Sequence, residues 1–275
     1  DFISNKNAQK KLQNYLLLTD SSSFEHVMTY EDLSFQPFSV IVKGAWAQKK
    51  LTSCHELLMD RNLSAIQSQH LLLELASFLS KLHKTKDNQG KSLFHGFLCP
   101  LTLMINLSPN DSINTFKFSF PGIAYALGKD GQTLISQYKK KPPKVPNSFE
   151  KQLLNQLDFF APEYFLDSLQ KDTGAHSDVY SFAKLAQYLF SSSCNSFKNI
   201  PESWLPFIKQ CLDPISDNRP RDLLELQDLL EASEIIQPPL SQIPQIPVAL
   251  QEEEEEEEEE SLGNLIDQLQ QQSKI

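Results

Sequence analysis

The segment from Ser64 to His83 constrains the fold of this chain most strongly. Its apolar residues recur at intervals of three and four, the spacing that places side chains on one face of a helix. Ser64 stands where an N-cap residue would accept hydrogen bonds from the free backbone N–H groups of the first turn. The pattern predicts one long buried helix against which other elements pack, with an apolar stripe of Leu71, Leu72, Leu75, Phe78, Leu79 and Leu82.

Shorter patterns precede this helix. Residues 7–18 and 51–59 have helical spacing, whereas residues 24–33 and 37–47 are rich in β-branched and aromatic residues. The Gln36-Pro37 break separates these last two segments, which therefore predict two strands of a meander. The N-terminal part of the chain is expected to mix helix and strand.

The segments after the long helix predict a hairpin and then helices. Residues 101–107 and 116–120 are short apolar runs, and the Ser108-Pro109-Asn110-Asp111 sequence between them has the composition of a turn. Beyond them the apolar spacing is helical, so the sequence predicts an α+β fold whose second half is all helix: 149–157, 177–190, 202–212 and 222–230.

The composition changes near residue 237. Four prolines are followed by nine consecutive glutamates, Glu252–Glu260, and then by a short apolar helical stripe. Adjacent carboxylates repel one another and prolines interrupt regular structure, so we expect a flexible acidic tail over residues 237–275. Residues 1–50 and 51–236 are expected to form the two parts of the ordered domain.

The charge and cysteine patterns exclude several classes of protein. The net charge is -10, but outside the glutamate run 26 acids face 25 bases, so no basic stripe for nucleic acid is present. The cysteines stand far apart without metal-ligand spacing, and no apolar run is long enough to span a bilayer. We expect a reducing, cytoplasmic setting for the four thiols: Cys54, Cys99, Cys194 and Cys211.

Five short motifs occur in an order that resembles the eukaryotic-type Ser/Thr protein kinases. The first lies between the long helix and the predicted hairpin, the second follows the hairpin, and the others fall in the helical half. Each is weak alone, but their shared order indicates a kinase-like fold over about residues 7–231. The motifs are His95-Gly96-Phe97-Leu98-Cys99-Pro100 for H-R-D-L-K-P, Phe120-Pro121-Gly122 for D-F-G, Ala161-Pro162-Glu163, Ser177-Asp178-Val179-Tyr180-Ser181-Phe182, and Cys211-Leu212-Asp213-Pro214 with Asn218-Arg219-Pro220.

The resemblance implies a protein-kinase-like fold, with a mainly helical large lobe at 51–236 and a remnant of the small lobe at 1–50. It also implies contacts that hold such a fold together. Glu163 is expected to pair with Arg219, and Asp178 to cap the backbone of the loop that contains His95. These four residues are the predicted structural motif.

The catalytic positions of the family are occupied by residues that lack the required chemistry. Phe97 stands at the position of the catalytic aspartate, and a phenyl ring cannot act as a base. Cys99 and Thr102 replace the lysine and the metal-binding asparagine, and Phe120 replaces the metal-binding aspartate. The first helix has no acid in residues 2–19, where Gln9 is the nearest equivalent of the family's glutamate. The pattern predicts a pseudokinase that needs no cofactor and is not expected to bind ATP.

We therefore interpret the chain as a catalytically inactive kinase-like domain that binds protein partners. Candidate interaction residues are the basic loop side chains Lys139, Lys140, Lys141 and Lys144. The composition also resembles divergent bacterial kinase-like proteins, which would make the chain an effector delivered into a host cytosol.

Two alternatives stay open. The first is a divergent ATP-dependent Ser/Thr kinase whose nucleotide-binding lobe lies upstream and whose metal is held by other acids, Asp111 and Asp130. The second is a helical adaptor unrelated to kinases.

Overall fold

The structure is a computed structural model of the chain, and it describes residues 6–19, 32–36, 39–43, 51–107, 113–118, 125–126, 128, 136, 140, 154–165, 173–193 and 195–225. Its internal contacts divide the chain into two units, Asp1–Ser233 and Glu234–Ile275. All described residues belong to the first unit, so the predicted acidic tail lies outside the described residues.

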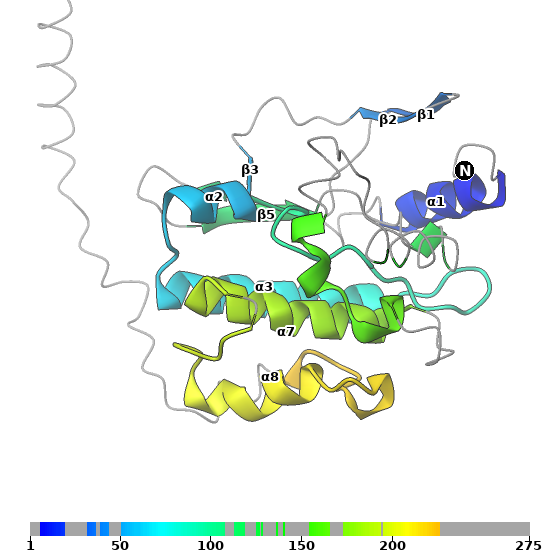
Figure 1. Cartoon of the computed structure of the whole chain (residues 1–275). Coiled ribbons are helices and arrows are strands. Elements are labelled where there is room, and N and C mark those ends of the chain that lie inside the picture. Colours follow the sequence, from blue (N-terminus) through cyan, green and yellow to red (C-terminus); the bar gives the residue numbers. More distant parts are fainter. Residues whose placement is uncertain are drawn as a thin grey trace, which may run out of the picture. The chain divides into compact units, whose positions relative to one another are not determined.

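Two long helices form the centre of this unit. Helix α3 (Ala65–Lys84) begins with a capping box in which the Ser64 hydroxyl accepts from Gln67 N and the Gln67 side chain accepts from Ser64 N. Helix α7 (Ala175–Ser191) packs against α3 (Figure 1). The predicted long helix is confirmed, and its whole apolar stripe is at most 5% exposed.

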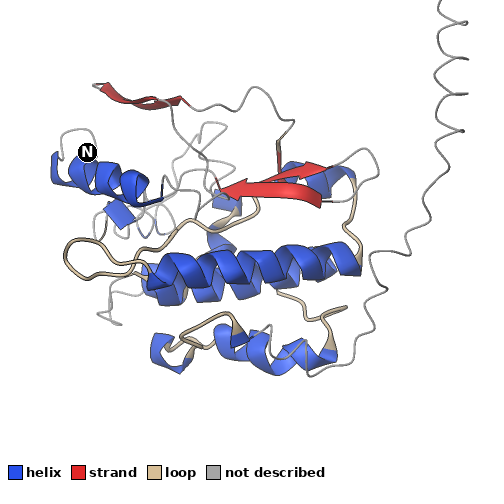
Figure 2. Ribbon diagram, turned by 180° about the vertical axis from the view of Figure 1, so that it is seen from behind, coloured by secondary structure: helices blue, strands red, loops and turns tan. Residues whose placement is uncertain are grey.

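A three-stranded antiparallel sheet covers one side of this helix pair (Figure 2). Its order is β3 (Thr52–Ser53), β4 (Leu103–Leu107) and β5 (Ile113–Phe118), with Leu103 opposite Phe118. The ring of Phe118 stacks on that of Phe78 in α3, with centroids 4.7 Å apart. The predicted hairpin is confirmed, but its second strand begins at Ile113, three residues earlier than expected. The inner face of the hairpin joins the sheet to the core.

The strand β3 was not predicted, because its two residues fall within the segment with helical spacing at 51–59. Ser53 accepts a hydrogen bond from Glu56 N and is the N-cap of α2 (Cys54–Asp60). An N-cap residue has extended backbone, so Thr52 and the N-cap Ser53 itself can both pair with β4. The helix predicted there starts three residues later than expected.

The strands β1 (Asp32–Gln36) and β2 (Ser39–Lys43) form a separate two-stranded antiparallel sheet. The first two residues of β1 belong to the strand predicted at 24–33, and the other three extend it beyond that prediction. Gln36 pairs with Ser39, which means that the strand runs up to the break and is registered from it. The other residues of that prediction, 24–31, lie outside the described residues.

The remaining described elements are helical. Helix α1 (Lys6–Thr19) matches its prediction. The helix predicted at 202–212 is divided into a 3-10 turn η6 (Glu202–Trp204) and α8 (Leu205–Cys211), because Pro206 is accommodated only in the first turn of a helix. Helix α8 packs against α7. Three further 3-10 turns are η3 (Leu157–Phe159), η4 (Pro162–Tyr164) and η7 (Ser216–Asn218).

Candidate functional site

The loop of residues 95–102, which connects α3 to β4, carries the first sequence motif. Asp178, near the start of α7, accepts hydrogen bonds from the backbone N–H groups of His95 and Gly96, each at 2.7 Å. Gly96 has a φ of 77°, a left-handed conformation that glycine adopts without steric cost. The carboxylate of Asp178 is 1% exposed and thus fixes the start of the loop from inside the core.

His83, in the last turn of α3, also contacts this carboxylate. Its Nε2 lies 3.0 Å from Asp178 Oδ2, and the two side chains are 7% and 1% exposed. Sequence analysis did not identify this residue. The only available signal was a basic side chain at the end of a helix that leads into the loop.

Phe97 occupies the centre of the loop. Its half-buried ring meets the ring of Phe160 edge-on, with centroids 5.6 Å apart. Phe160 belongs to a small apolar cluster with Leu157, Ala161 and Tyr164, and Phe97 connects that cluster to the main core. Tyr164 donates its hydroxyl to the Gly96 carbonyl at 2.6 Å. The ring at position 97 therefore serves as packing between two apolar clusters.

Thr102 closes the loop upon itself. Its hydroxyl donates toward the Phe97 and Cys99 carbonyls, at 2.6 and 3.1 Å, and accepts from Cys99 N at 3.1 Å. The hydroxyl of Thr102 thus serves the geometry of its own loop.

The titratable side chains of this loop, His95 and Cys99, are both buried. Burial raises the pKa of the Cys99 thiol, and the hydrogen bond with Thr102 opposes this only in part, so the thiol stays protonated at neutral pH. The imidazole of His95 accepts from Phe97 N through Nδ1 at 3.2 Å and packs on the ring of Phe118. Neither side chain reaches solvent, since they are 0% and 1% exposed.

A buried ion pair holds the next motif. Arg219 donates to Glu163 through both terminal nitrogens, at 2.8 and 2.9 Å, and Ser177 donates its hydroxyl to the same carboxylate at 2.8 Å. Burial alone would raise the pKa of Glu163, but the hydrogen bonds and charge of Arg219 hold that pKa below its ordinary value. The predicted pair of Glu163 and Arg219 is present.

Arg219 also links two other segments of the chain. Its guanidinium donates to the backbone carbonyls of His176, Asp213 and Pro214, and it lies 5.0 Å from the centroid of the Tyr180 ring. The side chain is fully buried. One arginine thus joins the turn at Glu163, the start of α7 and the segment after α8.

The other predicted site residues are only partly described. Lys140 is exposed, whereas Phe120, Lys139, Lys141 and Lys144 lie outside the described residues, as do Asp111 and Asp130. Gln9 lies in α1 and is half-buried.

The described part of the chain lacks both a metal-binding cluster and a membrane-spanning helix. It contains no group of three or more His, Cys, Asp or Glu side chains that could hold a metal ion. None of its helices is both long and apolar enough to cross a membrane.

No family model matches the chain, and no curated protein matches its sequence. Among solved structures it is similar to the kinase domain of PknI from Mycobacterium tuberculosis, with a TM-score of 0.54 at 13% identity over 84% of this chain and 81% of that one. A double mutant of the same domain gives a TM-score of 0.55 at 15% identity, over 84% of this chain and 80% of that one. The chain therefore has a protein-kinase-like fold.

Proposed function

We propose that this chain is a catalytically inactive kinase-like domain that works as a protein-interaction or regulatory module. The observation that carries the proposal is the loop at 95–102, where Phe97 packs against Phe160 and Thr102 bonds to the loop backbone. Phosphoryl transfer requires a carboxylate at the first position and a metal ligand at the second. Here both side chains have structural contacts instead.

The contrast with the fold-determining residues supports the same proposal. Asp178 has two backbone donors and a histidine, and Glu163 has a bidentate arginine and a serine. These buried charges are costly to keep without partners, and their partners are all in place. The contacts that stabilise the fold are therefore present, whereas the position of the catalytic base holds a phenylalanine. This combination favours a function that depends on the shape of the domain and not on catalysis.

The finer parts of the proposal follow from the sequence. The partner is a protein, ATP is not a ligand, and Lys139, Lys140, Lys141 and Lys144 belong to the interaction surface. The domain ends near residue 236, and residues 237–275 are a tail that folding does not need. We place the chain in a reducing cytosol. If the chain is an effector, this is the cytosol of a host cell. The described cysteines Cys54, Cys99 and Cys211 are free and buried.

Radiolabelled ATP with magnesium and casein as a generic acceptor tests this proposal. We expect no phosphate incorporation above a reaction without the chain. Phe97→Asp should also be inactive, because catalytic groups act as a unit and one restored base lacks its metal ligand. Incorporation that requires the chain would overturn the proposal in favour of a divergent ATP-dependent kinase.

A thermal-shift titration with ATP and magnesium tests nucleotide binding separately. A ligand that binds the folded state raises the melting temperature as its concentration passes the Kd. We expect the melting temperature to stay constant up to millimolar ATP. A concentration-dependent rise would show that a nucleotide site exists.

A further inference from the structure

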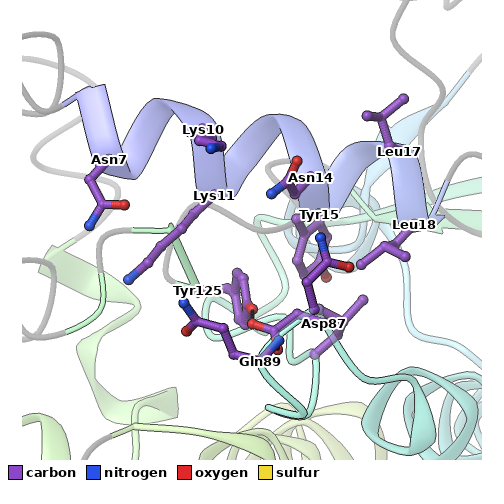
Figure 3. Close-up of a pocket in the computed structure, with 12 residues that line it drawn as sticks. Asn7, Lys10, Lys11, Asn14, Tyr15, Leu17, Leu18, Asp87, Gln89 and Tyr125 are labelled. Atoms are coloured by element: carbon purple, nitrogen blue, oxygen red, sulfur yellow. Dashed lines mark hydrogen bonds between the residues drawn. The ribbon is translucent and has the colours of Figure 1, made fainter.

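A cavity of about 450 Å³ lies between α1 and the loop that follows α3. One wall is a face of α1, the other is the turn at Asp87–Gln89 with Leu93, and Tyr125 adds an aromatic side chain. Figure 3 shows Lys11 and Tyr15 extending from the helix toward the side of Asp87, Gln89 and Tyr125. The cavity is separate from the loop at 95–102.

The helix wall of this cavity is cationic. Lys10 and Lys11 line it together with Asn7 and Asn14, and the helix contains no acidic residue. Among the residues that the structure describes, neither lysine forms an ion pair. This wall therefore offers two positive charges and two amides to a ligand.

Asp87, the one carboxylate among the described lining residues, is engaged by donors of its own loop and by Tyr125. It accepts from the backbone N–H groups of Gln89 and Lys91, each at 2.8 Å, and from the hydroxyl of Tyr125. Desolvation opposes ionisation, but these hydrogen bonds outweigh it and hold the pKa of Asp87 below its ordinary value. These donors hold the carboxylate on the loop side of the cavity. The positive charges of Lys10 and Lys11 on the opposite wall are therefore available to a ligand.

The far end of the same wall is apolar. Leu17 and Leu18 follow the lysines along α1, and Leu93 faces them from the loop. Leu17 is 74% exposed and can therefore be reached by a ligand. The rise of a helix, about 1.5 Å per residue, separates Lys10 and Lys11 from Leu17 and Leu18 by about 10 Å. An extended peptide covers that distance in about three residues.

We propose that this cavity binds a peptide segment of a partner protein in which an acidic side chain and a large aliphatic one lie about three residues apart. The carboxylate lies against Lys10 and Lys11, and the aliphatic side chain lies against Leu17 and Leu18. A nucleotide fits less well, because the rings of Tyr15 and Tyr125 pack on each other at 5.4 Å and are at most 5% exposed, so neither offers a face for base stacking. The inference deepens the proposed function and rests on it, since it gives the binding role a partner chemistry.

Selection from a displayed library of random 12-residue peptides on the intact chain tests the proposal. We expect recovered peptides to share an acidic residue about three positions away from Leu, Ile or Met. By fluorescence anisotropy, Lys10→Glu/Lys11→Glu should weaken the best peptide about tenfold or more, because two attractions become repulsions. Leu17→Asp should weaken it as well, and raised salt should weaken the wild-type complex.

The matched control is Lys198→Glu/Lys209→Glu, which makes the same change in net charge at two exposed lysines of another region. It should bind the peptide as the wild type does. Recovery of no binder, of binders without the acidic residue, or of binders that ignore the Lys10 and Lys11 reversal would overturn the proposal. None of these outcomes affects the phosphate-transfer test, so the two proposals fail independently.

Discussion

The charged side chains around the loop at 95–102 and those beside α1 differ in how they are paired. Around the loop, the buried carboxylates of Asp178 and Glu163 are surrounded by donors from distant segments. In the cavity, Lys10 and Lys11 stand on an open wall, and the nearby carboxylate of Asp87 is engaged by donors of its own side. The difference separates charges that hold a fold together from charges available to a partner, and it predicts where a substitution alters stability.

The largest loss of stability is expected from breaking the buried ion pair. Glu163→Ala and Arg219→Ala should each lower the free energy of unfolding by about 3–5 kcal/mol, because each leaves an uncompensated buried charge. Urea denaturation of both single variants and the double variant measures this. The double variant should lose much less than the sum, and strict additivity would show that the two side chains do not interact.

Asp178→Ala should have the next largest effect. It removes the acceptor of two backbone N–H groups and the partner of His83, and a hydrogen bond to a charged group contributes about 1.5–3 kcal/mol. We expect a loss of about 3 kcal/mol and faster hydrogen exchange at the amides of His95 and Gly96. Unchanged exchange at these two amides would contradict the role assigned to Asp178.

The pair of Glu163 and Arg219 should also make stability depend on pH. The pKa of Glu163 is lowered from 4.5 in the folded state, so its contribution is present above pH 4.5 and is lost as the pH falls below that value. Melting curves between pH 3 and pH 7 should therefore show a steeper acid loss for the wild type than for Glu163→Gln. Parallel curves would mean that this carboxyl does not titrate differently on folding.

The smallest effect is expected at the cavity. Lys10→Glu/Lys11→Glu should change the free energy of unfolding by about 0.5 kcal/mol or less, because surface substitutions without buried partners are nearly neutral. Urea denaturation of this variant and of Arg219→Ala under the same conditions compares the two losses in the free energy of unfolding. A loss as large as that of Arg219→Ala would show that these lysines support the fold.

The sequence predicted best what depends on local spacing. Leu71, Leu75 and Leu82 could be assigned to a buried helix face because their intervals alone define that face. The pairing of Glu163 with Arg219 joins residues 56 positions apart, and only the resemblance to a known family suggested it. The kinase-like fold was predicted correctly for the same reason.

The residues that were missed depend on contacts between distant segments. His83 meets Asp178 across 95 positions, and Tyr125 meets Asp87 across 38. Lys10 and Lys11 could be placed on the polar side of a helix, but nothing local shows that this helix faces the loop after α3. The two residues of β3 are too few for any alternation to be visible.

The hydroxyl of Thr102 ties the loop at 95–102 to its own backbone. It donates toward the carbonyls of Phe97 and Cys99 and accepts from the amide of Cys99, so its hydrogen-bonding capacity is used by the loop backbone. Exchange of Thr102 for a residue able to hold a metal would first release these contacts, and the loop would loosen before any ion could bind. Any such exchange is thus expected to lower the folding stability of the chain.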